Sequence, residues 1–395
     1  GAVAAEVAFR FARPDDAVDL LYSAPDNAPN GLYTTDQSLY SVPTAGFRGR
    51  QTSLGYTNEI RINSLGLRGP EVGPKTGPRY LAAGDSFTMA AQVSEAETFV
   101  GHLQEQTGWE IFNSGVDGYG TYQPIGRYRQ LDEALDLDGV ILTFFLGNDV
   151  HDNVRWPQIQ AEAKRLQPGR PLARRPVGAV HGFFYKHSAL YAAIQMMHRR
   201  RAMSNPNYGE RHRWVSELRL FTRDGGGVLG AQMPATENAL RDFARATAER
   251  GDKLIVALAP PAFQIETSRM NATFELVGID PATATPDAVG HAVWSVLERN
   301  NIARCDLVQP LRRAHEAGRE MYLQYDGHWA PKGCEWNPQA PSWCFTHMYD
   351  PEGVLSTIPS VMSVWIGAHF GRLVAADGIS RPRGVLAHWC ALAVV

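Results

Sequence analysis

The stretch Tyr80-LAAGDSFTM-Ala90 decides how the rest of the chain is interpreted. Its apolar first half is typical of a short buried strand, and the strand stops at Gly84-Asp85-Ser86. A serine at this point is either a turn residue or a nucleophile. A serine nucleophile needs a histidine that takes its proton, a carboxylate that orients the histidine, and hydrogen-bond donors for an oxyanion. If Ser86 is a nucleophile, the rest of the chain must supply those groups.

Outward from this strand, apolar runs alternate with helical patterns. The candidate strands are 79–84, 109–113, 140–147, 253–260 and 302–308. One intervening helix is expected to open at Ser94-EAE, whose Ser and Glu fit a capping box, and another at Thr285-Pro286, with the threonine as N-cap. Continuous apolar strands joined by helices predict a parallel sheet covered on both faces, a three-layer α/β/α sandwich with five strands.

The chain divides by composition into three parts. Residues 1–78, rich in Gly, Pro, Asn and Tyr, predict an extension with hairpins that packs on the core. The catalytic domain is expected over 79–333, with a long insertion at about 151–250. Residues 334–395 form an atypical tail that holds three of the four cysteines, and a Cys334–Cys344 bridge is one of several pairings left open.

Composition excludes several classes of protein. With 44% hydrophobic and 20% charged residues and a net charge of −3, we expect a globular protein and no nucleic-acid partner.

The first residues lack the basic segment followed by an apolar segment that is typical of a signal peptide, and no apolar run is long enough to span a bilayer. A start at glycine leaves room for a removed segment, so a membrane tether stays open and export is preferred over the cytoplasm. Oligomeric state is undetermined.

Three polar or glycine-rich loops follow successive predicted strands. They are Gly84-Asp85-Ser86, Asn113-SGVDGYG-Thr121 and Gly147-NDVH-Asp152. In a parallel sheet of this kind, sites form at the carboxyl ends of the strands, so these loops are expected to meet at one edge.

The remaining groups of a serine-dependent site are also present. Asp326-Gly327-His328-Trp329 offers a base, His328, and a carboxylate, Asp326, in a predicted loop. The backbone N–H groups of Ser86 and Gly118 and the side-chain amide of Asn148 are candidate oxyanion donors. Gly115 and Gly120 are alternatives to Gly118. Asp149 and His151 lack the spacing of metal ligands, so neither a metal nor another cofactor is expected.

In order along the chain, these motifs resemble those of the SGNH (GDSL) hydrolases. The resemblance covers roughly residues 58–333 and includes Asn63-SLGLRG, a lead-in that often precedes the GDS strand in bacterial members. It implies the flavodoxin-like sheet order 2-1-3-4-5. It also implies that Ser86 is the nucleophile, His328 the base, Asp326 the orienting acid, and Ser86, Gly118 and Asn148 the oxyanion hole. The absence of G-x-S-x-G argues against the α/β-hydrolase fold.

The chain departs from the common family pattern in the spacing of the acid and the base. Many members place the aspartate three residues before the histidine, where this chain has Tyr325. The D-x-H-W form resembles the catalytic pair of alginate O-acetyltransferases of the same superfamily, in which the pair precedes the serine.

The leading expectation is an esterase that removes short acyl groups, acetyl above all, from an alcohol or a carbohydrate. Acyl transfer to a polysaccharide is the first alternative. A non-catalytic glycan-binding protein with the same fold is the second.

Overall fold

The computed structural model describes most of the chain from residue 31 to residue 334. The described residues are 2–12, 31–53, 56–172, 184, 187–191, 193–194, 213–276, 278–323 and 327–334. The tail after residue 334, with its cysteines 344 and 390, lies outside them, as does Asp326.

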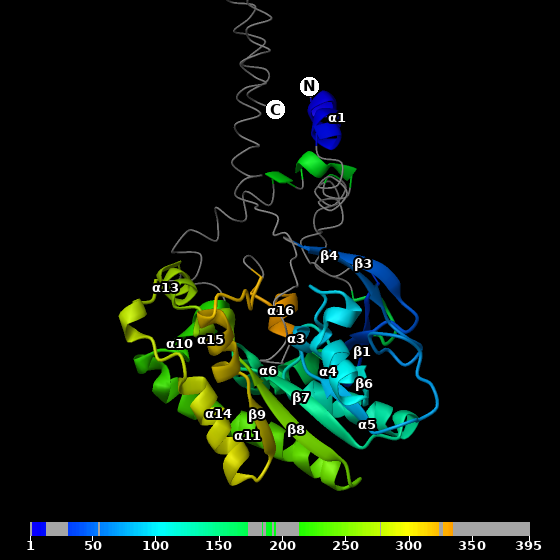
Figure 1. Ribbon diagram of the computed structural model, residues 1–395, viewed down its shortest axis with the longest axis vertical. Coiled ribbons are helices and arrows are strands. Elements are labelled where there is room, and N and C mark those ends of the chain that lie inside the picture. Colours follow the sequence, from blue (N-terminus) through cyan, green and yellow to red (C-terminus); the bar gives the residue numbers. More distant parts are fainter. Residues whose placement is uncertain are drawn as a thin grey trace, which may run out of the picture.

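A five-stranded parallel sheet forms the centre of the molecule (Figure 1). Its strands are β5 (Arg79–Ala83), β6 (Glu110–Asn113), β7 (Gly139–Phe145), β8 (Lys253–Ala259) and β9 (Ala303–Asp306). Their spatial order is β6-β5-β7-β8-β9, and every pair is parallel. The expected strands and the order 2-1-3-4-5 are confirmed.

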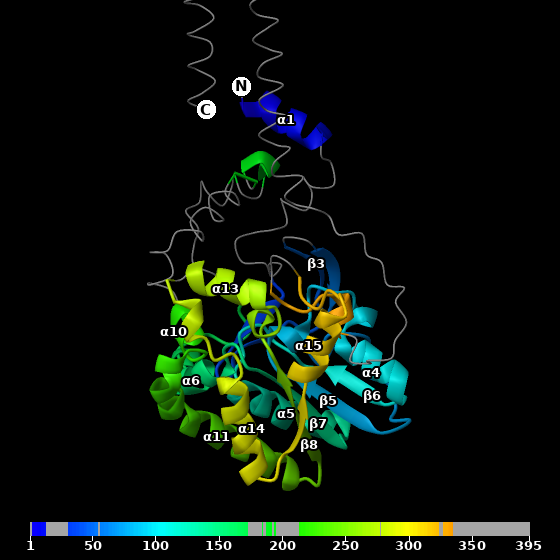
Figure 2. The same ribbon diagram turned by 60° about the vertical axis from the view of Figure 1, so that its left-hand side comes forward.

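Helices cover both faces of the sheet, as the three-layer prediction requires. The chain steps from β5 to β6 in one direction and then through β7, β8 and β9 in the other, so right-handed crossovers place the connecting helices on opposite faces. Helix α11 (Gly226–Ala248) packs against both α5 (Tyr122–Leu135) and α14 (Ala288–Arg299) on one face (Figure 2). Helix α4 (Phe99–Thr107) packs on β6, and α12 (Ala262–Ile265) contacts α15 (Val308–Glu316).

The described helices have the following bounds: α1 Ala2–Ala12, α3 Ser86–Met89, η1 Glu95–Glu97, α4 Phe99–Thr107, α5 Tyr122–Leu135, α6 Asp149–Ala163, α10 Arg213–Arg219, η2 Arg223–Gly225, α11 Gly226–Ala248, α12 Ala262–Ile265, α13 Thr267–Leu276, η3 Pro281–Thr283, α14 Ala288–Arg299, α15 Val308–Glu316 and α16 Pro331–Cys334. None of the described helices is long and apolar enough to cross a membrane.

Both predicted helix starts need correction. The capping box at Ser94 is present, but it caps the short 3₁₀ turn η1, and Thr98 then returns to extended backbone and caps α4 itself. The second predicted helix, α14, begins at Ala288 with Asp287 as its N-cap, and not at Thr285-Pro286. Thr285 belongs to the preceding loop, because its N–H donates a hydrogen bond to Phe221 O.

Residues 31–62 form two antiparallel hairpins. Strands β1 (Tyr33–Asp36) and β2 (Tyr40–Pro43) pair with each other, as do β3 (Arg48–Ser53) and β4 (Tyr56–Arg61). They pack against two loops at the carboxyl edge of the sheet through a cluster separate from the main core. We call this cluster the second core; its buried members are Leu32, Tyr33, Leu39, Ile60, Ile62, Met89, Ala91, Val116 and Tyr119.

Polar contacts join the same hairpins and loops. The Tyr119 hydroxyl donates to Ser41 O, and Asn58 Nδ2 donates to Ala91 O over 3.2 Å. The extension therefore contacts the loops that carry the predicted site. The bounds proposed for the extension, the insertion and the tail remain predictions.

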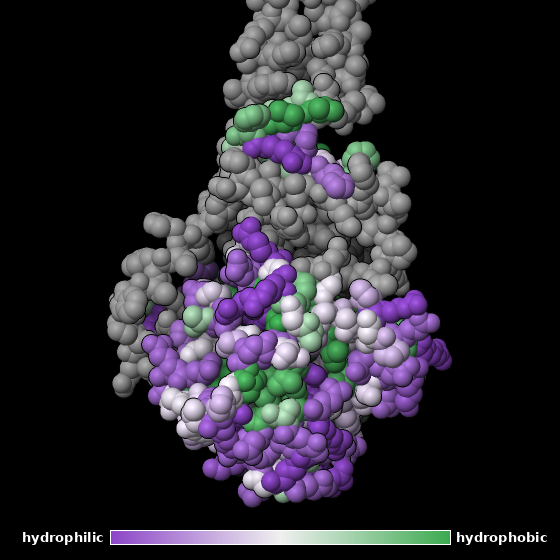
Figure 3. Space-filling model, turned by 90° about the vertical axis from the view of Figure 1, so that its right-hand side faces the viewer, coloured by the Kyte–Doolittle hydropathy of each residue, from purple (hydrophilic) through white to green (hydrophobic). Residues whose placement is uncertain are grey.

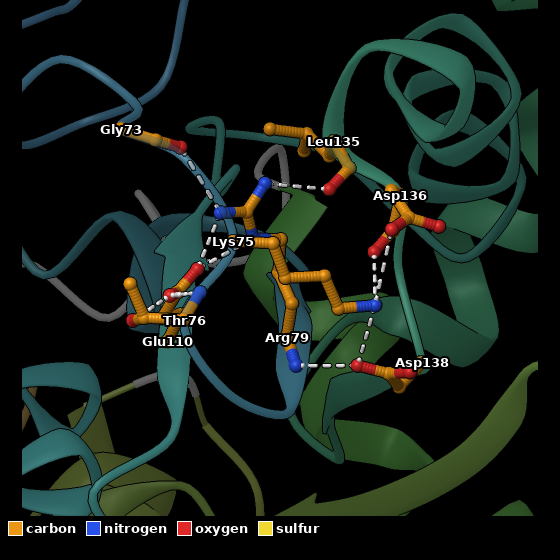
Figure 4. Close-up of polar contacts among 8 residues, drawn as sticks. All are labelled: Gly73, Lys75, Thr76, Arg79, Glu110, Leu135, Asp136 and Asp138. Carbon is orange, nitrogen blue, oxygen red and sulfur yellow. Dashed lines mark hydrogen bonds and ion pairs between the residues drawn. The ribbon is translucent and has the colours of Figure 1, made fainter.

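A polar cluster ties the strands together at the amino end of the sheet (Figure 4). Arg79, 4% exposed, donates from Nε to Glu110 Oε2 over 2.6 Å and from its two terminal nitrogens to Leu135 O and Gly73 O. Hydrogen bonds from Thr76 and the guanidinium of Arg79 hold the pKa of Glu110 low, at about 2. This cluster lies at the opposite end of β5 from Ser86.

The described surface is mostly hydrophilic on the face shown in Figure 3, with a hydrophobic patch on the globular part. Helix α1 also exposes apolar side chains, with Val3 79% and Phe11 85% exposed.

Candidate active site

Ser86 lies at the carboxyl end of the central strand β5. It is the first residue of α3, and the Asp85 carboxylate caps this helix by accepting a 2.9 Å hydrogen bond from Phe87 N–H. The Ser86 side chain is half-buried, whereas Asp85 and Phe87 on either side of it are buried. The short apolar strand and the Asx-type cap thus present a hydroxyl at the sheet edge on a fixed turn.

His328 approaches this hydroxyl from the other end of the chain. Its Nε2 lies 2.7 Å from Ser86 Oγ, within hydrogen-bond range. Trp329 is fully buried and packs edge-on against Phe87, with ring centroids 5.1 Å apart. The loop is also fixed by a 2.8 Å hydrogen bond from Leu323 N–H to His328 O. The tryptophan of the D-x-H-W form therefore anchors the histidine beside the serine.

The orienting acid falls on a residue that the structure does not describe. Asp326 lies outside the described ranges, so its role stays a prediction.

Of the three glycines in the loop after β6, Gly118 has the conformation and space expected of an oxyanion donor. Its φ of +78° favours glycine, and a Cβ placed there would meet nothing within 4 Å. A Cβ at Gly115 would lie 2.2 Å from Met89 N, and one at Gly120 would lie 3.0 Å from the Cβ of Asp152. Packing thus explains Gly115 and Gly120, while the space beside Gly118 is open.

The glycine loop and the nucleophile turn are joined by Asn113. Its Nδ2 donates to Thr88 O over 2.7 Å, and its Oδ1 accepts from Gly115 N–H over 3.0 Å. Its backbone carbonyl accepts from Arg68 N–H. Because one side chain contacts both segments, the relative position of Ser86 and the glycine loop is fixed.

Asn148 follows β7, the strand next to β5. It is the N-cap residue of α6 and is half-buried, and its backbone carbonyl accepts from Asp152 N–H. The side-chain Oδ1 is buried and accepts no hydrogen bond from the described residues. The amide therefore stands at the same sheet edge as Ser86, as its place in the sequence predicts.

The electrostatic environment of the site is dominated by Asp85. Burial raises the pKa of this carboxyl to about 7, and the nearby charges of Asp117 and Asp152 act in the same direction. The hydrogen bond from Phe87 N–H and the charge of His328 oppose the rise in pKa. An acidic group with a pKa near neutral thus lies next to Ser86 in sequence.

Three residues that support the site were not recognised from the sequence. Arg68 and Asn113 connect the loops, and Asp85 caps α3. Arg68 belongs to the Asn63-SLGLRG lead-in, which was a signal for the family but carried no assigned role.

Within the described ranges, no group of three or more His, Cys, Asp or Glu side chains could hold a metal ion. This statement includes Asp149 and His151, the residues weighed from the sequence as metal ligands.

Comparison with known proteins finds a family model that is similar to part of the chain. The model of a family described as "SGNH hydrolase-like domain, acetyltransferase AlgX" matches residues 220–340. This range includes the D-x-H-W residues and excludes Ser86. No match was found among curated proteins.

Solved structures also match at low identity. A lipolytic protein of the G-D-S-L family from Veillonella parvula is 12% identical, with a TM-score of 0.34 over 65% of this chain and 92% of that one. An acetylxylan esterase from Geobacillus stearothermophilus is 14% identical, with a TM-score of 0.33 over 65% of this chain and 89% of that one. The matched range and the sheet order agree with the resemblance to the SGNH hydrolases that the motifs indicated.

Proposed function

We propose that this chain, a member of the SGNH hydrolase superfamily, cleaves short acyl esters, acetyl esters above all, of an alcohol or a carbohydrate. The observation that carries the proposal is the 2.7 Å approach of His328 Nε2 to Ser86 Oγ at the carboxyl edge of the sheet. A serine hydroxyl becomes an effective nucleophile when a histidine in this position takes its proton.

In the first half of the reaction, Ser86 Oγ bonds to the ester carbonyl carbon and its proton passes to His328 Nε2. The carbonyl oxygen becomes an oxyanion, for which the N–H groups of Ser86 and Gly118 and the amide of Asn148 are the proposed donors. The carbon–oxygen bond to the alcohol then breaks, and the departing alcohol takes the proton from His328. An acyl group remains on Ser86.

In the second half, His328 takes a proton from water, and the resulting hydroxide oxygen bonds to the acyl carbon. The bond to Ser86 breaks, Oγ regains its proton from His328, and the carboxylic acid leaves. Asp326 is proposed to orient the imidazole through both halves, as the family resemblance implies.

A second candidate function is transfer of the acyl group to a glycan hydroxyl. It is favoured by the matched family, whose description names an acetyltransferase. The chemistry differs only in the second half, where a sugar hydroxyl replaces water. The same residues serve both reactions, so only products distinguish them.

The primary test is hydrolysis of p-nitrophenyl acetate by the wild-type protein and by Ser86→Ala. We expect turnover to fall by at least ~1,000-fold, because removing a serine nucleophile eliminates the acyl-enzyme route. Ser38→Ala, which changes an exposed serine in the turn between β1 and β2, is the matched control and is expected to retain full activity. Unchanged turnover in Ser86→Ala would contradict the proposal.

Hydrolysis and transfer are then separated by the products formed when an acetyl donor and an oligosaccharide acceptor are both present. Release of acetate alone, under every condition tried, would remove the transferase candidate. Acetylated oligosaccharide that disappears in Ser86→Ala would establish it.

A further inference from the structure

A pocket separate from the candidate site lies on the same sheet edge, at the carboxyl ends of β8 and β9. It has a volume of about 200 Å³, and its lining includes Leu258 at the end of β8 and Asp306 at the end of β9. The first turns of α14 form one wall through Asp287, Gly290 and Trp294. Strand β7 separates β8 from β5, which leads to Ser86, and none of the proposed catalytic residues lines the pocket.

Gln264, one of the residues that line this pocket, has a buried acceptor without a donor. The residue is 4% exposed, and its Nε2 donates to Asp287 Oδ1 over 3.0 Å. Its Oε1 is also buried, yet it accepts no hydrogen bond from the described residues. A buried acceptor without a donor is destabilising, so a ligand that brings a hydroxyl or an N–H to this atom gains a favourable contact.

The surrounding contacts fix the orientation of this amide. Arg312 donates to both oxygens of Asp287, over 2.6 and 3.1 Å, and also to Gln264 O. Burial raises the pKa of Asp287, but the hydrogen bonds from Arg312 and Gln264 outweigh it and leave the pKa below its ordinary value. Asp287 is therefore ionised and paired with Arg312, and its hydrogen bond from Gln264 Nε2 fixes the orientation of the Gln264 amide.

Other lining residues also present acceptors or an aromatic ring. Asp306 accepts from Val308 N–H through Oδ1, over 2.8 Å, and its other carboxylate oxygen has no hydrogen-bond donor among the described residues. Trp294 supplies a ring whose stacking partner among the described residues is the guanidinium of Arg304, 4.3 Å from the ring centroid. The pocket thus suits a ligand rich in donors with an apolar face.

Gly290 keeps the space beside Gln264 open. A Cβ at this position would lie 3.4 Å from Leu146 Cδ1 and 3.8 Å from Gln264 Nε2, both ordinary contact distances. Its φ is not positive, so the backbone does not require glycine either. Glycine is a poorer helix former than alanine. A longer side chain at this position would enter the pocket that Gly290 lines.

We propose that this pocket binds a neutral, hydroxyl-rich group the size of a single sugar ring, whose hydroxyls donate to Gln264 Oε1 and Asp306 and whose apolar face lies against Trp294. The volume of about 200 Å³ is below the ~300–1,000 Å³ of sites that enclose drug-sized ligands, which favours one ring over a longer chain. This inference does not depend on the catalytic proposal, because it uses none of its residues.

The test is binding of methyl β-D-glucopyranoside and methyl α-D-mannopyranoside to the full chain, measured by saturation-transfer NMR and by titration. These glycosides carry no ester, so the wild-type protein leaves them intact. We expect a Kd in the millimolar range for at least one of them. Gly290→Leu, which fills the pocket, and Gln264→Leu, which removes the acceptor, are each expected to weaken binding by at least ~10-fold.

The matched control is Gly230→Leu. Gly230 also lies in a helix, α11, but it is exposed and a Cβ there would meet nothing within 4 Å. This variant should bind the glycoside like the wild type, and circular dichroism of all variants should match. Failure of the wild type to bind either glycoside would overturn the proposal, as would wild-type affinity in Gly290→Leu. Binding of tetramethylammonium without binding of a glycoside would overturn the neutral ligand class.

Discussion

Asp85 has two effects at one position. Its carboxylate caps α3 and so orients the turn that presents Ser86, but the same side chain is 2% exposed, where a negative charge is poorly solvated. The fold therefore favours the neutral carboxyl, and its pKa rises from 3.8 to about 7. Stability due to this group is present at acidic pH and is lost as the pH rises through the folded pKa.

Asp85→Asn separates these two effects. The amide oxygen can still accept from Phe87 N–H, but no charge forms in the buried site. We expect the free energy of unfolding of the variant, relative to wild type, to increase by roughly 2 kcal/mol between pH 5 and pH 8. Urea denaturation at both pH values measures this difference. Parallel stability curves for the two proteins would show that the Asp85 charge is not destabilising.

Sequence alone predicted that Ser86 and His328 would lie together, and the structure brings them within hydrogen-bond distance. Each stands in a short motif whose order along the chain is typical of a known family. The supporting residues were not predictable in the same way. The contact of Arg68 with carbonyl groups more than twenty positions later depends on how separate segments pack, and no local pattern encodes it.

At the level of elements, α3 depends on contacts from outside itself. A four-residue helix has little intrinsic stability, since most of its hydrogen-bonding groups lie at its ends. Arg68 donates hydrogen bonds to three carbonyls at and after the end of α3. Its Nη1 donates to Met89 O and Ala90 O over 2.5 and 2.6 Å, and its Nη2 donates to Val93 O over 2.8 Å. Burial lowers the pKa of this guanidinium to about 10, so it is still protonated at neutral pH.

Arg68→Met removes a donor from all three carbonyls, of which Ala90 O keeps the hydrogen bond from Val93 N–H, and is expected to destabilise the fold by about 3 kcal/mol. Because the affected turn carries Ser86, kcat for p-nitrophenyl acetate should also fall, with a smaller change in KM. Both are measured below the melting temperature of the variant. Arg61→Met, which removes an exposed pair with Glu95, serves as the control and should change stability by less than ~1 kcal/mol.

If Arg68→Met lowers stability but leaves kcat at the wild-type value, the packing of Phe87 and Met89 alone holds the serine turn. Arg68→Lys gives an intermediate test, because an ammonium group keeps the charge but cannot reach three carbonyls with the geometry of a guanidinium.

Elements with one dominant pattern were predicted well, and those with competing signals were not. Strands β5, β7 and β8 are largely apolar runs, and all five strands were predicted within two residues of their observed ends. Thr285-Pro286 has the composition of a helix start, but the hydrogen bond from Thr285 N–H to Phe221 O fixes it in a loop. A long-range backbone contact of this kind overrides a local preference.

At the scale of the whole molecule, the two ends of the sheet have separate roles. The amino end holds the ion-pair cluster around Arg79, and the carboxyl end holds the candidate site (Figures 1 and 4). Strand β5 connects them, with all five of its residues buried. We therefore expect stability and activity to respond independently to changes at the amino end.

Arg79→Met tests that separation. It removes a buried cation from its contacts with Glu110, Gly73 and Leu135, so the free energy of unfolding should fall by roughly 3 kcal/mol. The kcat and KM for p-nitrophenyl acetate, measured while the variant is folded, should be those of the wild type. Lys75→Met, at the more exposed neighbouring pair, is the control. A reduced kcat in folded Arg79→Met would show that the two ends are coupled.

The overall architecture was predictable because alternation of strands and helices restricts the topology strongly, although the order of the strands came from the family resemblance. Packing of residues 31–62 against the site loops was expected only in outline. The sequence gives no indication that Tyr33 and Ile60 share a cluster with Met89 and Val116, because such contacts join residues distant along the chain.

The second core limits how far the chain could be shortened from its amino end without loss of the candidate site. Met89, Val116 and Tyr119, which flank Ser86 and Gly118 in sequence, complete their burial against residues 32–62. A fragment that begins at Arg79 would retain all the proposed catalytic groups and the whole parallel sheet. It would, however, expose to solvent the apolar side chains with which the site loops pack on residues 32–62. The smallest autonomous catalyst should therefore begin before Leu32, so this extension cannot be exchanged as an independent module.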